Sequence, residues 1–210
     1  MSDPTQPADR LRAALHAPDA SSRLRSAMSA GTRPADEYIP VLIERCRVEP
    51  DFGVREMLTW ALIRHDPSRT VDLLLPELVS EVPQARSQAL HTLSKVGDAR
   101  AWPALTPALL HDEHLEVALA AWRTAARLAP EHERPALARQ LAEHLGDGDR
   151  PVQKSLTRAL LMLGESAAAP LEAAARSGEE PRRIHALATL RLLADPEEDV
   201  EEAFDRARRG

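Results

Sequence analysis

The sequence predicts an all-α fold made of about six helical hairpins stacked along the chain. Three observations predict it. Ala, Leu, Glu and Arg, which favour helices, dominate the composition, and aromatic residues are only 3% of the chain. From residue 8 onward, apolar residues recur at spacings of three and four, as on one face of a helix. The pattern also restarts about every 30 to 35 residues, which is the period of helical repeat arrays.

The predicted hairpins each pair a first helix with a second, returning helix. They occupy residues 8–31, 35–62, 71–96, 102–128, 135–163 and 168–194. Helix-breaking pairs or glycines separate them, because Pro cannot continue a helix and Gly favours its end. These stops are Gly31, Asp66-Pro67, Gly97-Asp98, Ala129-Pro130, Gly164 and Asp195-Pro196.

The domain organisation follows from these patterns. Residues 1–7 are polar and contain proline, which predicts a disordered tail. Residues 8–196 form one repeat domain. Residues 197–210 begin with Glu and end with Arg, an order that suits a helix dipole, so a C-terminal capping helix or tail is expected there.

Two sets of residues repeat in register. When the second helices are aligned, one position is occupied by Arg25, Arg55, Arg86, Ala118, Gln153 and Arg183. In the first helices, a proline recurs as Pro40, Pro76, Pro103, Pro135 and Pro170. Two independent registers with the same period favour a repeat array over an ordinary helical bundle.

Four sequence motifs of this chain resemble those of HEAT repeats, in particular the short bacterial kind found in phycobilin-lyase-like scaffolds. The matching parts are a Gly97-Asp98 stop, a first helix opening with residues 102–105 (Trp-Pro-Ala-Leu), an acidic turn at residues 111–113 and a Val54-Arg55 opening of a second helix. The resemblance implies a right-handed α-α superhelix, a HEAT-like solenoid, whose second helices line the concave face. HEAT arrays serve many tasks, so the resemblance implies a fold and not an activity.

A stripe of positive charge is expected along the second helices. Positions five and nine residues after the aligned position lie one turn apart and should be exposed. They contain no Asp or Glu, and they supply the candidate partner-binding residues Trp60, Arg64, His91, Lys95, Arg123, Arg127 and Arg158. The stripe is either a groove for an acidic or phosphorylated ligand, or a solvated face whose cations pair with turn carboxylates such as Glu113 or Glu116. Trp60 either anchors a partner or packs between hairpins.

We therefore expect a non-catalytic scaffold that binds an acidic or extended segment of a protein partner along the concave face. One alternative is a DNA-binding protein related to HEAT-like alkylpurine DNA glycosylases, although the net charge of −6 disfavours a nucleic-acid partner. Another is a small-molecule-binding regulator, if a closed apolar pocket forms near Met57, Trp60 and Met162.

Catalytic and metal chemistry find no support in the residues. Residues 111–114 (His-Asp-Glu-His) fall in a turn, where side chains diverge, so no metal is expected. HEAT-type deoxyhypusine hydroxylases hold two irons through several His-Glu dipeptides, and this chain has only His132-Glu133. No phosphate-binding loop or nucleophile elbow occurs, and Cys46 is expected to be a core thiol. Neither catalytic residues nor a cofactor is predicted.

The expected location is the cytoplasm. Cys46 is the only cysteine, which excludes an internal disulfide and favours a reducing compartment. The first residues lack the apolar core of a signal peptide, and no apolar run is long enough for a transmembrane helix.

Overall fold

The computed structural model describes residues 6–177 and 179–209, and these residues form helices and turns with no β-strand. This confirms the predicted all-α fold of helical hairpins. Residues 1–5 of the predicted tail lie outside the described residues, and helix α1 begins at Pro7. Each helix in the described ranges is too short or too polar to cross a membrane.

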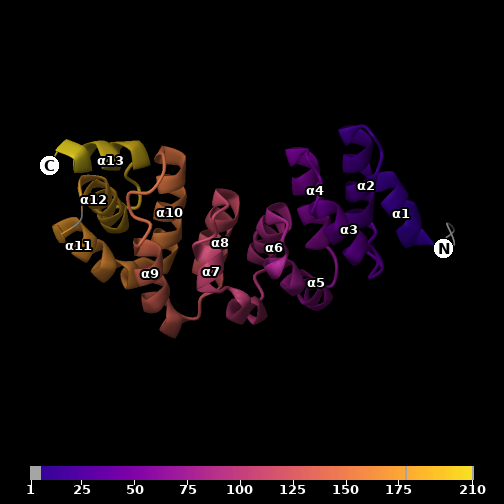
Figure 1. Ribbon diagram of the computed structural model, residues 1–210, viewed down its shortest axis with the longest axis horizontal. Helices are drawn as coiled ribbons and strands as arrows, with labels where there is room; N and C mark the ends of the chain where they lie inside the picture. The colour runs from indigo at the N-terminus through magenta and orange to yellow at the C-terminus, as the bar shows by residue number, and fades with distance from the viewer. Residues whose placement is uncertain (1–5, 178, 210) are drawn as a thin grey trace. The chain divides into compact units, whose positions relative to one another are not determined.

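The chain divides into two compact units, and unit 1 comprises residues 1–104. Its first helices α1, α3 and α5 pack in one row and its second helices α2, α4 and α6 in another (Figure 1). Its elements are α1 (Pro7–Leu15), α2 (Ala20–Thr32), α3 (Tyr38–Cys46), α4 (Phe52–Leu62), α5 (Pro67–Leu74), η1 (Leu75–Val79), α6 (Pro83–Val96) and η2 (Ala99–Ala104).

Unit 2, residues 105–210, repeats the same arrangement. The row α7, α9, α11 packs against the row α8, α10, α12, and α13 packs on α12. Its elements are α7 (Pro107–Leu110), α8 (Leu115–Leu128), η3 (Glu131–Glu133), α9 (Arg134–Ala142), α10 (Arg150–Leu163), η4 (Gly164–Ala167), α11 (Ala168–Ser177), α12 (Glu180–Ala194) and α13 (Val200–Arg209).

Two predicted first helices are broken in the structure by proline. The helix expected over 71–82 ends at Leu74, and a 3-10 segment containing Pro76 follows it. The helix expected over 102–110 becomes η2, which contains Pro103, and the short α7, which starts at Pro107. Each proline removes one N–H from the helical hydrogen-bond pattern and clashes with the preceding turn, so these segments tighten or restart.

Aspartates begin several of the helices. The side chains of Asp19, Asp51, Asp66 and Asp149 each accept a hydrogen bond from a backbone N–H in the first turn of the following helix. A capping carboxylate satisfies one of the N–H groups that a helix leaves unpaired, typically worth about 1 kcal/mol. Three of these caps start second helices, so they set where the returning helix of a hairpin begins.

The repeated arginine of the second helices holds the turn of its own hairpin. Nη1 of Arg55 donates to the carbonyls of Glu49 and Pro50, at 3.1 and 2.8 Å. Nη1 of Arg86 donates to the carbonyl of Ser80 at 2.8 Å. These carbonyls follow the end of a first helix, where no helical N–H reaches them. The side chain four residues after the helix N-cap therefore closes the hairpin.

This contact corrects the alignment in the first hairpin. Arg23, and not Arg25, donates to the carbonyls of Ala17 and Pro18, at 3.0 and 2.9 Å. Arg23 lies four residues after the N-cap Asp19, whereas Arg25 bonds only to the Ser22 hydroxyl. The aligned position is thus Arg23, two residues earlier than the sequence pattern indicated.

In the fourth and fifth hairpins, where Ala118 and Gln153 replace the repeated arginine, other side chains donate to the turn carbonyls. Nε2 of Gln153 donates to the carbonyls of Gly146 and Gly148, at 3.4 and 3.3 Å, so the amide keeps the contact. Ala118 has no donor, but Nε1 of the buried Trp122 donates to the carbonyl of Leu110, the last residue of α7, at 2.9 Å. Trp122 is 2% exposed.

A buried carboxylate joins the first two hairpins of unit 1. Glu49 is fully buried and accepts two hydrogen bonds of 2.8 Å from Arg23, one from Arg45 and one from the Asp51 N–H. Burial by itself would raise the pKa of Glu49, but the hydrogen bonds from Arg23, Asp51 and Arg45 lower it to about 2. Glu49 therefore stays ionised and holds α2 against the turn between α3 and α4.

Replacing Glu49 by Gln should destabilise unit 1 by about 3 kcal/mol, because two arginines would be left beside a neutral group in a dry site. The control is Glu44→Gln, since Glu44 is exposed and its ion pair with Arg12 should be worth less than about 1 kcal/mol. Urea denaturation followed by circular dichroism measures both. Equal, small losses of unfolding free energy in the two variants would show that the Glu49 network does not stabilise the packing of the first two hairpins.

Unit 2 contains a buried polar network between α10 and α12. The Gly146 N–H donates to Nδ1 of His185 at 3.1 Å, so the ring proton lies on Nε2, which donates to the Thr157 hydroxyl at 2.9 Å. That hydroxyl donates to Thr189, whose own hydroxyl donates to the His185 carbonyl. Burial, together with the charge of Arg150, lowers the pKa of His185 to about 4, so the ring is neutral in the folded unit.

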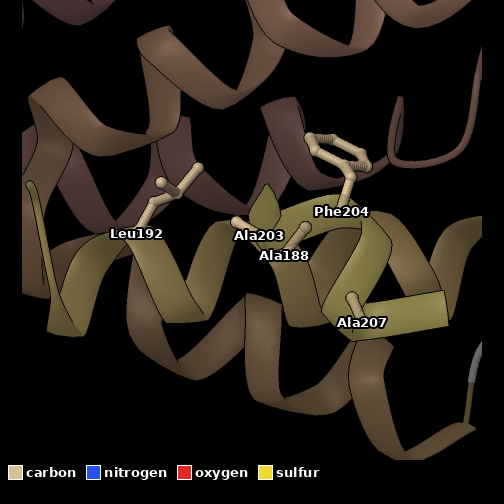
Figure 2. Packing of buried hydrophobic residues seen from close by; sticks show 5 residues of the cluster. All are labelled: Ala188, Leu192, Ala203, Phe204 and Ala207. Atoms are coloured by element: carbon tan, nitrogen blue, oxygen red, sulfur yellow. The ribbon is translucent and has the colours of Figure 1, made fainter. Parts of the chain in front are cut away.

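Helix α13 covers this region. Figure 2 shows a cluster of Ala188 and Leu192 on α12 with Ala203, Phe204 and Ala207 on α13. Phe204 is fully buried, stacks near His185 with ring centroids 5.3 Å apart, and lies 3.8 Å below the guanidinium of Arg150. The segment predicted as a capping helix or tail is therefore helical over α13, with its apolar face on α12.

The neutral His185 predicts an acid-sensitive unit 2. An unfolded chain takes up this proton below pH 6.5 and the folded one only near pH 4, so stability is complete above pH 6.5 and falls by about 3 kcal/mol as the pH drops to 4. Urea midpoints measured across this range should show the loss in the wild type and not in His185→Gln. His132→Gln, at an exposed site, should show the same pH dependence as the wild type. A pH dependence of stability that survives in His185→Gln would contradict the assignment of the acid sensitivity to His185.

Candidate functional site

The predicted basic stripe is built differently in the two units, beginning with Trp60 on α4. The ring of Trp60 is half-buried and packs against Gly31 of α2, where an added Cβ would lie 2.4 Å from its Cζ3. Helix α2 continues to Thr32, so Gly31 does not end the helix as expected but makes room for the indole. Trp60 therefore packs between hairpins. The guanidinium of Arg64, which is exposed, lies 5.8 Å from the indole centroid, within cation–π range.

The two remaining stripe residues of unit 1 are paired with a carboxylate. Glu56 on α4 lies with Oε1 at 3.0 Å from Nε2 of His91 and Oε2 at 3.1 Å from Nζ of Lys95, both on α6. Partial burial would raise the pKa of Glu56, but the Lys95 hydrogen bond and the charge of His91 outweigh it and the pKa lies below its usual value. The carboxylate that the stripe positions lack is thus supplied by the neighbouring helix.

In unit 2 the stripe consists of Arg123 and Arg127 on α8 and Arg158 on α10. We call these three residues the α8–α10 basic face. All three side chains are exposed, and within the described part of the chain no carboxylate lies within ion-pair distance of them. Helices α8 and α10 pack side by side, and Arg123 and Arg158 occupy equivalent positions on them. The charge of this face is therefore open to a partner.

For Arg158, the repeat shows one difference from unit 1. Glu56 lies one residue after the turn-closing arginine of α4, and the equivalent position of α8 is Leu119. Glu116, the acid nearest to Arg123 on the same side of α8, lies two turns before it, about 10 Å away along the helix axis. By the repeat register, Leu119 thus takes the position on α8 that Glu56 takes on α4.

An apolar side chain lies beside one of these charges. Met162, one turn after Arg158 on α10, is 43% exposed, whereas the exposed Leu115 lies at the start of α8, eight residues before Arg123. Arg127 also lies in the last turn of α8, where the helix dipole favours a cation. The face is therefore mixed, with long cationic side chains beside exposed apolar ones.

The histidines and the cysteine lie in separate surroundings. The described residues contain no group of three His, Cys, Asp or Glu side chains placed to hold a metal ion. In the turn at residues 111–114, His111 stacks on His144, with ring centroids 4.5 Å apart, and His114 bonds to Asp112. Burial, with the nearby charges of Glu77 and Glu49, raises the pKa of the Cys46 thiol to about 12, so it remains a core thiol.

Comparisons with known proteins agree with this architecture. A family model described as HEAT repeats matches residues 39–126. None of the curated proteins matches this chain by sequence. The crystal structure of an engineered protein matches with a TM-score of 0.51 and 19% identity, over 98% of this chain and 96% of that one.

Two natural proteins are also similar in structure. The CpcE–CpcF complex of phycocyanin lyase from Nostoc sp. PCC7120 has a TM-score of 0.43 and 18% identity, covering 100% of this chain and 96% of that one. Human deoxyhypusine hydroxylase in complex with glycerol has a TM-score of 0.48 and 18% identity, covering 95% and 94%. At such identities the likeness concerns the fold alone. Residues 39–126 therefore match HEAT repeats, and the paired helices continue on both sides of this segment within the described residues.

Proposed function

We propose that this protein is a non-catalytic scaffold of HEAT-like repeats, and that an acidic, extended segment of a protein partner binds along the second helices of unit 2. The observation that carries the proposal is the α8–α10 basic face. Its three guanidiniums are exposed and, among the described residues, have no carboxylate partner. A guanidinium presents a planar fork of donors that matches a carboxylate in a bidentate way, so the face suits Glu and Asp side chains.

The apolar residues favour a protein over a nucleic acid. Met162 lies one turn after Arg158, and Leu115 is exposed at the start of α8, so both helices offer apolar contact area that a phosphate backbone does not use. The net charge of −6 opposes long-range attraction of DNA, whereas a local basic face still attracts a short acidic peptide within about 10 Å at ordinary salt. A peptide with alternating acidic and apolar residues fits both components of the face.

Unit 1 has a smaller part in the proposal. Glu56 already neutralises His91 and Lys95, so these two predicted contacts offer little free charge. The exposed Arg64 and the outer edge of Trp60 remain available for an auxiliary contact on the second helices of unit 1. In this proposal the arginines of unit 2 provide most of the binding free energy.

Charge reversal tests the proposal. A fluorescein-labelled peptide rich in Glu, with interspersed Leu, serves as the probe, and fluorescence anisotropy measures its affinity. The double variant Arg123→Glu/Arg158→Glu should bind at least about tenfold more weakly than the wild type, because two attractive contacts become repulsive. Circular dichroism should show unchanged helicity, since both side chains are exposed.

The matched control is Arg176→Glu/Arg208→Glu, which makes the same change in net charge at exposed positions of unit 2 away from the second helices. It should retain the affinity of the wild type. If both double variants weaken binding equally, the attraction is due to net charge and the face is not a site. A duplex DNA probe that binds more tightly than the peptide, with a steep dependence on salt, would replace the protein partner by a nucleic acid.

A further inference from the structure

Unit 2 contains a second feature, away from the α8–α10 basic face: a cavity of about 460 Å³ between α9 and α11, bordered by the start of α12. Arg139 on α9 and Arg182 on α12 line it, together with small residues. Its volume lies within the range of small-molecule sites, about 300 to 1,000 Å³. We propose that this cavity binds a small aliphatic carboxylate, a function beyond the scaffold role.

The cavity exists because the facing helices carry alanines. Ala142 on α9 and Ala169, Ala173 and Ala174 on α11 line it, and none extends beyond Cβ. Ala142 and Ala174 are buried, whereas Ala169 and Ala173 are exposed. Larger side chains at these positions would fill the space between the two first helices. The result is an apolar floor of helix surface that an alkyl chain can cover.

The two arginines of the cavity are positively charged, and no carboxylate of the described residues pairs with them. Arg139 is exposed, and Arg182 donates one hydrogen bond from Nη1 to the Glu143 carbonyl at 3.1 Å. Neither guanidinium forms an ion pair within the described residues, and the nearby Glu172 on α11 lies 3.5 Å from Arg176 instead. Two guanidiniums beside an apolar floor attract an anion that also carries apolar surface. A carboxylate matches the guanidinium fork, which leads to the proposed ligand class.

The size of the cavity sets the size of the ligand. At about 460 Å³ the cavity lies in the lower half of the range of small-molecule sites, so a short ligand is expected. A medium-chain fatty acid fits this volume, with its carboxylate at an arginine and its chain along the alanines. Ser166, which also lines the cavity, adds a single hydroxyl to an otherwise apolar wall.

Isothermal titration calorimetry with octanoate on the full chain tests the inference. Octanoate should bind, and octanamide, its neutral match, should bind at least about tenfold more weakly, because it lacks the charge that the arginines recognise. The double variant Arg139→Gln/Arg182→Gln should lose octanoate affinity by a similar factor. Ala169→Leu should also weaken binding, since its side chain would occupy the cavity.

Arg176→Gln is the control, because it removes a charge from the same helix at a position that does not line the cavity. It should bind octanoate as the wild type does. Three outcomes would overturn the inference: no octanoate binding, equal binding of octanamide, or affinity that the arginine and leucine substitutions leave unchanged. Thermal melting of each variant distinguishes a lost site from a lost fold.

Discussion

The hairpin turn is the constraint on which the rest of the structure depends. A first helix ends with carbonyl groups that no helical N–H can reach, and a side chain four residues into the second helix reaches back to them. Arg23, Arg55, Arg86 and Gln153 make this contact. In α4 this contact fixes how the second helix is rotated relative to its turn. Leu58 and Leu62, three and seven residues after Arg55, are fully buried, whereas Arg64, nine residues after it, is exposed.

Much of this could be predicted from the sequence, because periodicity and stop signals are local. The fold class and every second helix followed from apolar spacing, and α8 ends at Leu128, the predicted end of the fourth hairpin. The misassignment of Arg25 arose because the sequence contains two arginines near the helix start, and only the capping contact of Asp19 distinguishes them. The role of Gly31 was missed for a different reason. Its partner, Trp60, lies on the next hairpin, and no local pattern signals that an indole will occupy the space above a glycine.

The candidate site shows the same division between local and non-local information. Counting charges along each helix found the stripe but missed Glu56, which lies on the neighbouring helix and pairs with His91 and Lys95. An ion pair between helices depends on how two repeats pack. A cation with no acid near it on its own helix can therefore be neutralised by a carboxylate at a different repeat position on the neighbouring helix. Leu119 occupies that register on α8, so the corresponding carboxylate is absent beside α10, the helix of Arg158. One position in the repeat thus distinguishes the neutralised pair His91 and Lys95 from Arg158, which is unpaired among the described residues.

Substitution at this position tests the central claim most directly, since it leaves every arginine in place. Leu119→Glu puts a carboxylate where α4 has Glu56, next to Arg158 across the helix pair and four residues before Arg123. Anisotropy with the Glu-rich peptide should show binding reduced at least about tenfold relative to the wild type, whereas Leu119→Gln should retain most of it. Unchanged peptide affinity in Leu119→Glu would contradict the claim that this face binds through arginines left without an internal partner.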